Sequence, residues 1–388
     1  MRADWELVKL GFVCDIQNVF AFDSKLFNNE GKGLPLIRIR DIKRGHSETF
    51  TTEKCDEAYV VKDGEYLIGM DGEFNIGQWK SENALLNQRV CKLLPSSKVL
   101  PRLIYYYIPK ALKDIEAKTA YATVKHLSSK QIKEISIPNL PLPEQQRIVD
   151  ILDQEFAKID ALKANAEKSL QAAKDLYAEC LNSSLAFKDG WKTKTLDKVC
   201  SKITDGTHNS PPNTAQGEFK YITAKNIKPW GLDLTDITFV SAEVHRDIFS
   251  RCNPFKGDVL YIKDGATTGI AILNPLEEEF SLLSSVALLK PLDTEITSKY
   301  LCYAMNSPKM YAFVREKMDG AAITRITLKK IKEFPISFPP LEEQDIITAR
   351  LDDLNDKCQT LQENYQKTLT LCDDLKQALL RKAFNGEL

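Results

Sequence analysis

Short apolar runs broken by glycine, asparagine and aspartate fill two long stretches of the chain, residues 1–142 and 188–340. Such runs, bounded by turn residues, are typical of β-strands. They occupy residues 36–40, 65–68, 90–94, 219–222, 258–262 and 285–289. A helical pattern follows the runs in each stretch, at 101–118 and 297–317. Each stretch is therefore predicted to be a mixed α+β domain with a substantial sheet.

A different pattern follows each stretch, with apolar residues alternately three and four positions apart after a cluster of prolines. Residues 143–187 and 341–384 are predicted to be helices of about 40 residues, or roughly 60 Å long. Residues 385–388 are expected to form a C-terminal tail. The apolar stripe of the second helix contains Leu351, Leu354, Cys358, Leu361, Tyr365, Thr368, Cys372, Leu375 and Leu379.

Smaller side chains occupy the aligned positions of the first helix. These positions are Leu152, Glu155, Ile159, Leu162, Ala166, Ser169, Ala173, Leu176 and Cys180. Large residues facing small ones favour close helix packing, which predicts an antiparallel two-helix coiled coil within the chain. The alternatives are that each helix lies against its own domain, or that each pairs with another chain.

The two halves of the chain are also similar in sequence. Residues 118–153 align with 317–352 without a gap, so that Ile132-Lys133-Glu134 matches Ile331-Lys332-Glu333. Further upstream, Trp5, Leu10, Val13 and Cys14 recur as Trp191, Leu196, Val199 and Cys200. A repeat of this length exceeds that of solenoid units, whose periods reach about 50 residues. The chain is therefore predicted to be a duplicated domain plus a duplicated helix, related by a pseudo-twofold axis.

Composition narrows the class of protein. The 388 residues are 43% hydrophobic and 28% charged, with a net charge of −1, which is ordinary for a globular protein. No run of about 18 apolar residues predicts a membrane span. The nine cysteines include no C-x-x-C pair, and only four histidines are present, so neither a disulfide framework nor a metal site is expected. The beginning of the sequence lacks the apolar core of a signal peptide, which favours a cytoplasmic protein.

Motifs for phosphate, dinucleotide or zinc binding and for serine catalysis are missing, so no catalytic residue is predicted and the chain is not expected to be an enzyme by itself. The segments 71–77 and 264–269 both contain Asp-Gly followed by a second glycine, which indicates a hairpin turn more than a ligand loop. Asp205 and His208 are three residues apart, but no nucleophile accompanies them, so a turn is favoured there as well.

Basic and amide side chains gather beside the predicted strands and turns. Arg38 and Arg40 are expected to alternate along one strand and to share a face. Lysines near phosphate provide affinity, whereas arginine, asparagine and glutamine can read base edges. The candidate DNA-binding residues are Arg38, Arg40, Lys43, Arg44, Asn75, Asn87, Gln88, Arg89, Lys125, His208, Lys225, Asn226, Lys228, Lys263, Thr267, Thr268 and Arg325. The alternative for each of them is an ordinary solvated surface.

The proline-led helix starts carry a recognisable motif. P-L-P-E-Q-Q-R-I-V-D-I-L-D at 141–153, P-L-E-E-Q-D-I-I-T-A-R-L-D at 340–352 and the ending Q-A-L-L-R-K-A-F-N-G-E-L at 377–388 resemble type I restriction–modification specificity subunits. The resemblance implies two target recognition domains that each read half of a split double-stranded DNA site. It also implies that the helix pair sets the spacing between the halves and docks two methyltransferase subunits.

The same resemblance implies that restriction and translocase subunits join the complex, and that S-adenosylmethionine, ATP and Mg²⁺ are bound by the partners and not by this chain. The residues expected to serve subunit docking and helix pairing are Glu144, Gln145, Leu152, Ile159, Leu162, Glu343, Gln344, Leu351, Leu354 and Leu361. A non-catalytic coiled-coil scaffold that binds protein partners is the alternative from another class.

Overall fold

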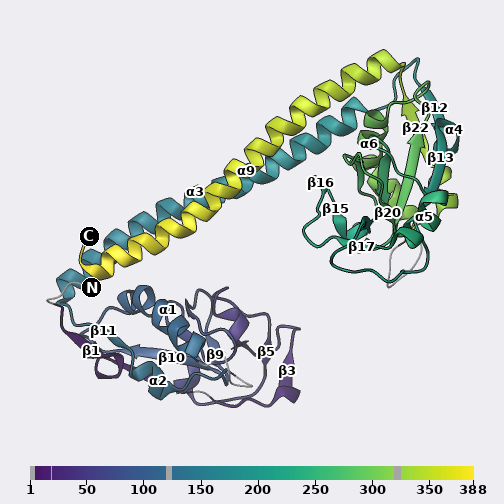
Figure 1. Cartoon of the computed structure of the whole chain (residues 1–388). Coiled ribbons are helices and arrows are strands. Elements are labelled where there is room, and N and C mark those ends of the chain that lie inside the picture. The colour runs from purple at the N-terminus through teal and green to yellow at the C-terminus, as the bar shows by residue number, and fades with distance from the viewer. Residues whose placement is uncertain (1–4, 19, 119–124, 319–324) are drawn as a thin grey trace. The chain divides into compact units, whose positions relative to one another are not determined.

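The computed structural model describes residues 5–18, 20–118, 125–318 and 325–388, and its chain forms two compact units (Figure 1). The first unit comprises residues 1–165 and 368–388, and the second comprises 166–367. The long helices α3 (Leu142–Ser184) and α9 (Leu341–Asn385) each contribute one part to each unit. No described helix is long and apolar enough to cross a membrane.

The first unit contains a four-stranded antiparallel sheet in the order β2-β10-β7-β8 and a mixed sheet in the order β3-β5-β4-β9-β6, while β1 pairs with β11. Its strands are β1 (Leu7–Lys9), β2 (Cys14–Gln17), β3 (Phe27–Asn28), β4 (Leu34–Ile37), β5 (Phe50–Thr51), β6 (Val60–Val61), β7 (Tyr66–Gly69), β8 (Ile76–Gln78), β9 (Ala84–Leu86), β10 (Val90–Pro95) and β11 (Ser136–Pro138). Its shorter helices are η1 (Leu10–Phe12), η2 (Ser24–Leu26), η3 (Ile39–Asp41), η4 (Glu57–Tyr59), α1 (Pro101–Lys118) and α2 (Ser129–Lys133).

The second unit repeats the four-stranded sheet and the separate strand pair, whereas its other sheet is smaller and it has an additional pair, β15 with β16. Its four-stranded antiparallel sheet has the order β13-β21-β18-β19, its smaller sheet the order β17-β14-β20, and β12 pairs with β22. Its strands are β12 (Lys192–Thr195), β13 (Cys200–Asp205), β14 (Phe219–Ile222), β15 (Ile227–Lys228), β16 (Gly231–Leu232), β17 (Thr238–Val240), β18 (Val259–Ile262), β19 (Ala271–Leu273), β20 (Ser281–Leu282), β21 (Val286–Pro291) and β22 (Pro335–Phe338). Its shorter helices are α4 (Leu196–Val199), η5 (Ala224–Asn226), α5 (Ala242–Arg251), α6 (Ser298–Asn306), α7 (Pro308–Lys317) and α8 (Leu328–Lys332).

Each four-stranded sheet packs against the helix that follows it in sequence. In the first unit Ile104, Ile108 and Leu112 lie four residues apart on one face of α1 and are buried against the sheet residues Cys91 and Leu93. In the second unit the corresponding helix is interrupted, because Ser307 caps α7 and Pro308 occupies its first turn. The predicted α+β architecture with two similar domains is confirmed.

The helices α3 and α9 pack together in antiparallel directions. Two ion pairs of the first unit show this direction, because Lys163 Nζ lies 2.7 Å from Asp373 Oδ1 while Lys376 pairs with Asp160. The most deeply buried stripe residues follow a spacing of seven, and the buried members are Leu152, Ile159, Ala166, Ala173, Leu351, Cys358 and Cys372. The prediction of a heptad-based antiparallel helix pair is therefore confirmed.

The intervening stripe positions are more accessible. Leu162 and Leu361 keep 51% and 42% of their surface exposed, and Leu354 is partly buried. These side chains lie beside the buried stripe residues between α3 and α9 and not among them. Any contribution of Leu162 or Leu361 to subunit docking stays a prediction.

A buried glutamine attaches the repeated start of each long helix to its own domain. Gln145 is 2% exposed; its Nε2 donates to the carbonyl oxygens of Lys98 and Leu140, and its Oε1 accepts from the Leu100 N–H. Gln344 is fully buried and makes the equivalent bonds to Glu295, Pro339 and Thr297. Both glutamines lie inside the molecule, whereas Glu144 and Glu343 remain partly exposed. The glutamine of each repeated Glu-Gln pair thus has an internal structural role.

An aspartate about two turns later makes a second link in each unit. Asp153 accepts hydrogen bonds from Arg102 Nε at 2.8 Å and from the Tyr106 hydroxyl, which joins α1 to α3. Asp352 likewise accepts from the Tyr303 hydroxyl at 2.7 Å and pairs with Lys299, which joins α6 to α9. Burial and these carboxylates raise the pKa of Tyr106 and of Tyr303. The sequence repeat is therefore strongest where the domain meets its helix.

Candidate nucleic-acid interface

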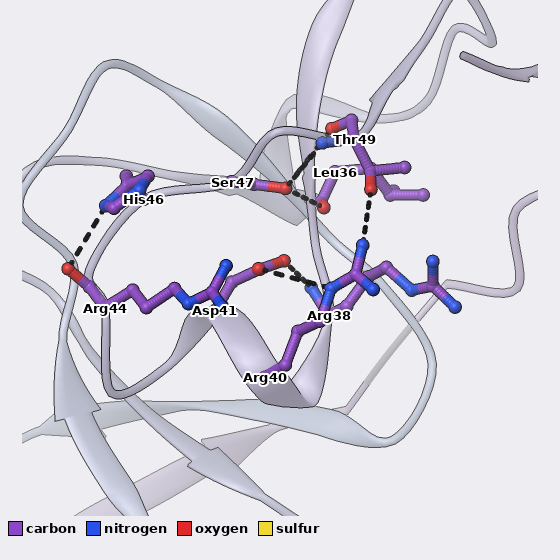
Figure 2. Close-up of polar contacts among 8 residues, drawn as sticks. All are labelled: Leu36, Arg38, Arg40, Asp41, Arg44, His46, Ser47 and Thr49. Carbon is purple, nitrogen blue, oxygen red and sulfur yellow. Dashed lines mark hydrogen bonds and ion pairs between the residues drawn. The ribbon is translucent and has the colours of Figure 1, made fainter. Parts of the chain in front are cut away.

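In the first unit, a short turn after β4 presents four exposed basic side chains, of which Figure 2 shows the three arginines. The strand ends at Ile37, so the expectation that Arg38 and Arg40 alternate along one strand is wrong. Asp41, which is 2% exposed, accepts a hydrogen bond from the Arg38 N–H at 2.9 Å and bends the chain into the 3-10 turn η3. The exposed side chains on this segment are Arg38, Arg40, Lys43 and Arg44.

The arginine side chains of this turn are only lightly held. Arg40 Nη2 donates to Thr49 Oγ1 at 3.3 Å, and its Nε lies 3.8 Å from Asp41 Oδ1 (Figure 2). Lys43 forms an ion pair with Glu73 at 2.7 Å, which links the turn to the β7–β8 loop. Exposed guanidinium groups with few internal bonds keep donors available for phosphate or base edges.

The second unit builds the same turn from different residues. Asn226 replaces the buried aspartate; its Oδ1 accepts from the Thr223 N–H at 3.0 Å and its Nδ2 donates to the carbonyl oxygen of Asp233. Asn226 is 2% exposed, so it shapes the loop from inside instead of presenting its amide to a ligand. Lys225 is exposed and Lys228 partly so, and they occupy the places of Arg40 and Lys43.

The β7–β8 loop forms a second polar group in the first unit. Asp71 Oδ2 lies 3.1 Å from Arg89 Nε, and Asp71 Oδ1 lies 2.6 Å from His126 Nδ1. The backbone is held from both sides, because Met70 N–H donates to the Arg89 carbonyl and Leu127 N–H donates to the Met70 carbonyl. The predicted hairpin is confirmed by the antiparallel pairing of β7 with β8. The loop therefore brings together residues that are distant in sequence.

Arg89 has an unusual backbone conformation. Its φ of 70° lies in the left-handed region, which is uncommon for a side chain other than glycine, asparagine or aspartate. Gln88 and Arg89 are exposed, whereas their neighbour Asn87 is 6% exposed. Arg89 and Gln88 are consequently better placed than Asn87 to meet a ligand. Strained residues of this kind concentrate at functional sites.

The remaining candidates of the first unit are engaged locally. Lys125 pairs with Glu116 at 3.1 Å, and Asn75 Nδ2 donates to the Glu73 carbonyl at 3.1 Å. Sequence reasoning did not single out the Asp71–His126 pair, although alignment of the halves places these residues opposite Asp264 and Arg325. The cross-strand bridges Asp71 to His126 and Asp264 to Arg325 confirm that equivalence.

In the second unit, the β18–β19 loop contains a buried charge cluster. Lys263 Nζ lies 3.4 Å from Asp205 Oδ2 and 3.2 Å from Asp264 Oδ2, and Asp205 also meets His208 Nε2 at 3.2 Å. Lys263 is 6% exposed and Thr268 is fully buried, with its hydroxyl bonded to Gly265. Both side chains therefore support the loop from inside, while His208, Thr267 and Arg325 are exposed.

The two polar segments of the second unit touch through Ser285. Its hydroxyl accepts from the Ala224 N–H at 3.1 Å, and its carbonyl accepts from the Lys263 N–H at 2.9 Å. The exposed residues Lys225, His208, Thr267 and Arg325 are thus attached to one connected backbone framework. Ser285 was missed because serine carries no distinctive sequence signal, yet it aligns with Arg89.

The family comparison matches residues 2–172 and 188–371 to the type I restriction modification DNA specificity domain. The chain belongs to this family. It is the DNA specificity subunit of a type I restriction–modification system and a non-catalytic component of that complex. The two matched segments correspond to the two halves of the sequence repeat.

Individual relatives of the specificity subunit extend over nearly the whole chain. The EcoBI specificity subunit of Escherichia coli is 29% identical over 99% of this chain and 86% of its own length. The EcoKI specificity subunit of Escherichia coli strain K12 is 23% identical over 92% of this chain and 82% of its own length.

Two solved structures share the fold. A chain from a structural study of complex assembly and conformational transition of the type I restriction–modification system has a TM-score of 0.73 at 20% identity, and covers 100% of this chain and 99% of its own. The HsdS subunit from Thermoanaerobacter tengcongensis has a TM-score of 0.55 at 19% identity, with 100% and 98% coverage. Among the described residues of the specificity subunit, no group of histidine, cysteine or acidic side chains is arranged to hold a metal ion.

Proposed function

We propose that each unit of this specificity subunit reads one half of a bipartite DNA site. The main support is that the equivalent turns η3 and η5 have similar backbone bonds but present different side chains. A buried side chain at the third position of a 3-10 turn, Asp41 or Asn226, fixes both frames. Arg38 and Arg40 are exposed in one frame, and Thr223 and Lys225 occupy the same places in the other. Because the two turns have the same geometry but different hydrogen-bond donors, the two units are expected to read different base sequences.

On this proposal, residues 1–142 and 188–340 are the target recognition domains, and 143–187 and 341–384 are the spacer helices. Two methyltransferase subunits dock on the subunit and modify DNA with S-adenosylmethionine, and restriction and translocase subunits use ATP and Mg²⁺. The chain itself binds no cofactor and acts in the cytoplasm. The paired arrangement of similar domains supports two equivalent docking events.

A domain exchange tests the assignment of half-sites. Residues 1–142 are replaced by the first domain of a relative with a different known site, and the exchanged subunit is assembled with its methyltransferase. Sequencing of methylated plasmid DNA should show one altered half-site and one unchanged half-site. The reciprocal exchange of 188–340 is the matched control and should alter the other half. A change in both halves, or in neither, contradicts the proposal.

Lengthening of the helix pair tests the spacer role. Seven residues are inserted into α3 between Ala166 and Ala173 and into α9 between Tyr365 and Cys372, which preserves the heptad stripe. The added length is about 10 Å, and the unread gap should grow by about three base pairs. Insertion of four residues in α3 alone breaks the stripe and is expected to abolish assembly instead. An unchanged gap in the heptad variant argues against the spacer role.

A further inference from the structure

A highly exposed tryptophan side chain lies at the tip of a hairpin in the second unit. The short strands β15 and β16 form a hairpin (Figure 1). They pair Ile227 with Leu232 and Lys228 with Gly231, so Pro229 and Trp230 form its turn. Trp230 is 75% exposed, although tryptophan is usually among the more buried residue types. Gly231 permits the turn through its φ of 132°.

The base of this hairpin is firmly anchored. Ile227 is 1% exposed within the core of the second unit, and Leu232 packs against the same core. Asn226 joins the two sides, because its Nδ2 donates to the Asp233 carbonyl and its own carbonyl accepts from the Asp233 N–H at 2.8 Å. An exposed aromatic ring on a rigid base is pre-organised for contact, since little flexibility is lost on binding.

Two lysines near the tip favour a polyanion as the ligand. Lys225 is exposed and Lys228 is partly exposed on the same segment, and the η5 turn bonds directly to Ser285 of the candidate interface. Asp233 lies at the base, where the hydroxyl of Thr235 and, to a smaller extent, Lys228 lower its pKa. Bases stack on aromatic rings while lysines meet the phosphates.

The equivalent turn of the first unit, which lies within the described residues, has no such hairpin. This turn continues from Lys43 through Arg44 to Gly45, whose N–H donates to the Asp41 carbonyl at 2.8 Å. The turn is closed by that bond, and Lys43 is held by Glu73. The aromatic tip therefore distinguishes the second reader from the first.

We propose that Trp230 is a wedge that inserts its indole ring at a base step of the half-site read by the second unit. This inference rests on the proposed half-site function and adds a specificity-determining residue to it. An inserted apolar ring partly unstacks the step and bends the duplex, and flexible pyrimidine–purine steps yield most easily. Trp230 then selects sequence by deformability at a step that no hydrogen bond reads.

The test uses the full subunit assembled with its methyltransferase and a duplex carrying the site that this complex methylates. 2-Aminopurine replaces one base at a time across the second half-site, with the methylation target adenine as an internal reference. The wild-type complex should raise the fluorescence several-fold at one step away from the target, because that step is unstacked. In Trp230→Ala this signal should disappear and affinity should fall about tenfold, whereas Trp230→Phe retains most of both.

The controls separate this inference from the half-site function. Phe12 of the first unit is 80% exposed, and Phe12→Ala should leave the profile unchanged. Trp230→Ala should keep the melting temperature, the salt dependence and the signal at the target adenine. An unaltered fluorescence profile in Trp230→Ala overturns the wedge but leaves half-site reading intact. If Trp230→Ala fails to assemble with the methyltransferase in the absence of DNA, Trp230 makes a protein contact instead. If the wild-type complex binds no DNA sequence selectively, both proposals fail.

Discussion

The side-chain Nε2 of Gln344 donates to the backbone carbonyl oxygen of Glu295 at 2.9 Å, inside the joint between the second domain and its long helix. Gln145 makes the equivalent bond to Lys98 in the first unit. Gln344→Ala removes the bonds of three backbone groups that are buried or partly buried, the carbonyls of Glu295 and Pro339 and the Thr297 N–H. We expect the free energy of unfolding of the second unit to fall by about 2–4 kcal/mol, measured by urea denaturation.

Gln359 provides the control for this substitution. It lies on the same helix α9, is exposed, and bonds only to Glu363 one turn away. Gln359→Ala should change stability by less than about 0.5 kcal/mol. Equal effects of the two substitutions contradict the structural role of the repeated glutamine.

Arg89 is expected to combine backbone strain with DNA binding. Arg89→Ala keeps the left-handed backbone without the side chain, whereas Arg89→Gly relieves a cost of about 1 kcal/mol. Both variants should weaken binding to the first half-site by a similar factor, on the order of tenfold. Thermal unfolding should show Arg89→Gly to be the more stable of the two. Unchanged DNA affinity in both variants rules out a role for this side chain.

The exposed arginines after β4 are expected to account for part of the salt dependence. If Arg38 and Arg40 meet phosphates, the double substitution to alanine lowers the slope of log affinity against log salt by about 2. Titrations between low and moderate salt measure the slope. Lys54→Ala removes an exposed charge elsewhere in the first unit and should change it little. A lower affinity with an unchanged slope indicates base contacts instead of phosphate contacts.

Buried thiols should make the protein less stable in alkali. Burial raises the pKa of Cys91 and of Cys252 from 9.0 to about 12, and both side chains are fully buried. Above pH 9 the unfolded chain releases protons that the folded chain retains, so stability is full below pH 9 and falls as pH rises toward 12. Each thiol contributes a slope of about 1.4 kcal/mol per pH unit.

Melting curves between pH 8 and 10.5 measure this loss. Cys91→Ala and Cys252→Ala should flatten the decline, even though each variant is somewhat less stable at pH 7. Cys55→Ala, at a thiol that is only partly buried, is the matched control and should leave the decline nearly as steep. The same slope in all three variants places the alkaline transition in other groups.

Several features of the fold could be predicted from local patterns. The apolar runs identified β7, β10, β14, β18 and β21, and the heptad stripe identified α3 and α9 and their pairing. The run at 36–40 was only partly a strand, because Asp41 bends the backbone after Ile37. The bond from the Arg38 N–H to the Asp41 carboxylate competes with extension of the strand. The pattern of apolar residues alone does not reveal that bond.

Several of the candidate DNA-binding residues predicted from the sequence are buried in the structure. Asn87, Asn226, Lys263 and Thr268 have the chemistry of base contacts, yet each is at most 6% exposed. Their burial depends on strands that pair across long sequence distances, such as β14 with β20 and β18 with β21. The sequence did not predict the exposure of Trp230 either, because aromatic residues are more often buried.

The sequence by itself determined the duplication, the α+β composition of each half, the helical tails and the family, since these depend on local periodicity and on direct similarity between segments. Only the tertiary structure decided which polar side chains support the loops and which face solvent. The physical reason is that a hydrogen-bonded amide or ammonium group can be buried only where the folded chain brings its bonding partners together around it. That convergence places Gln145 and Gln344 in their joints and leaves Arg89 and Trp230 at the surface.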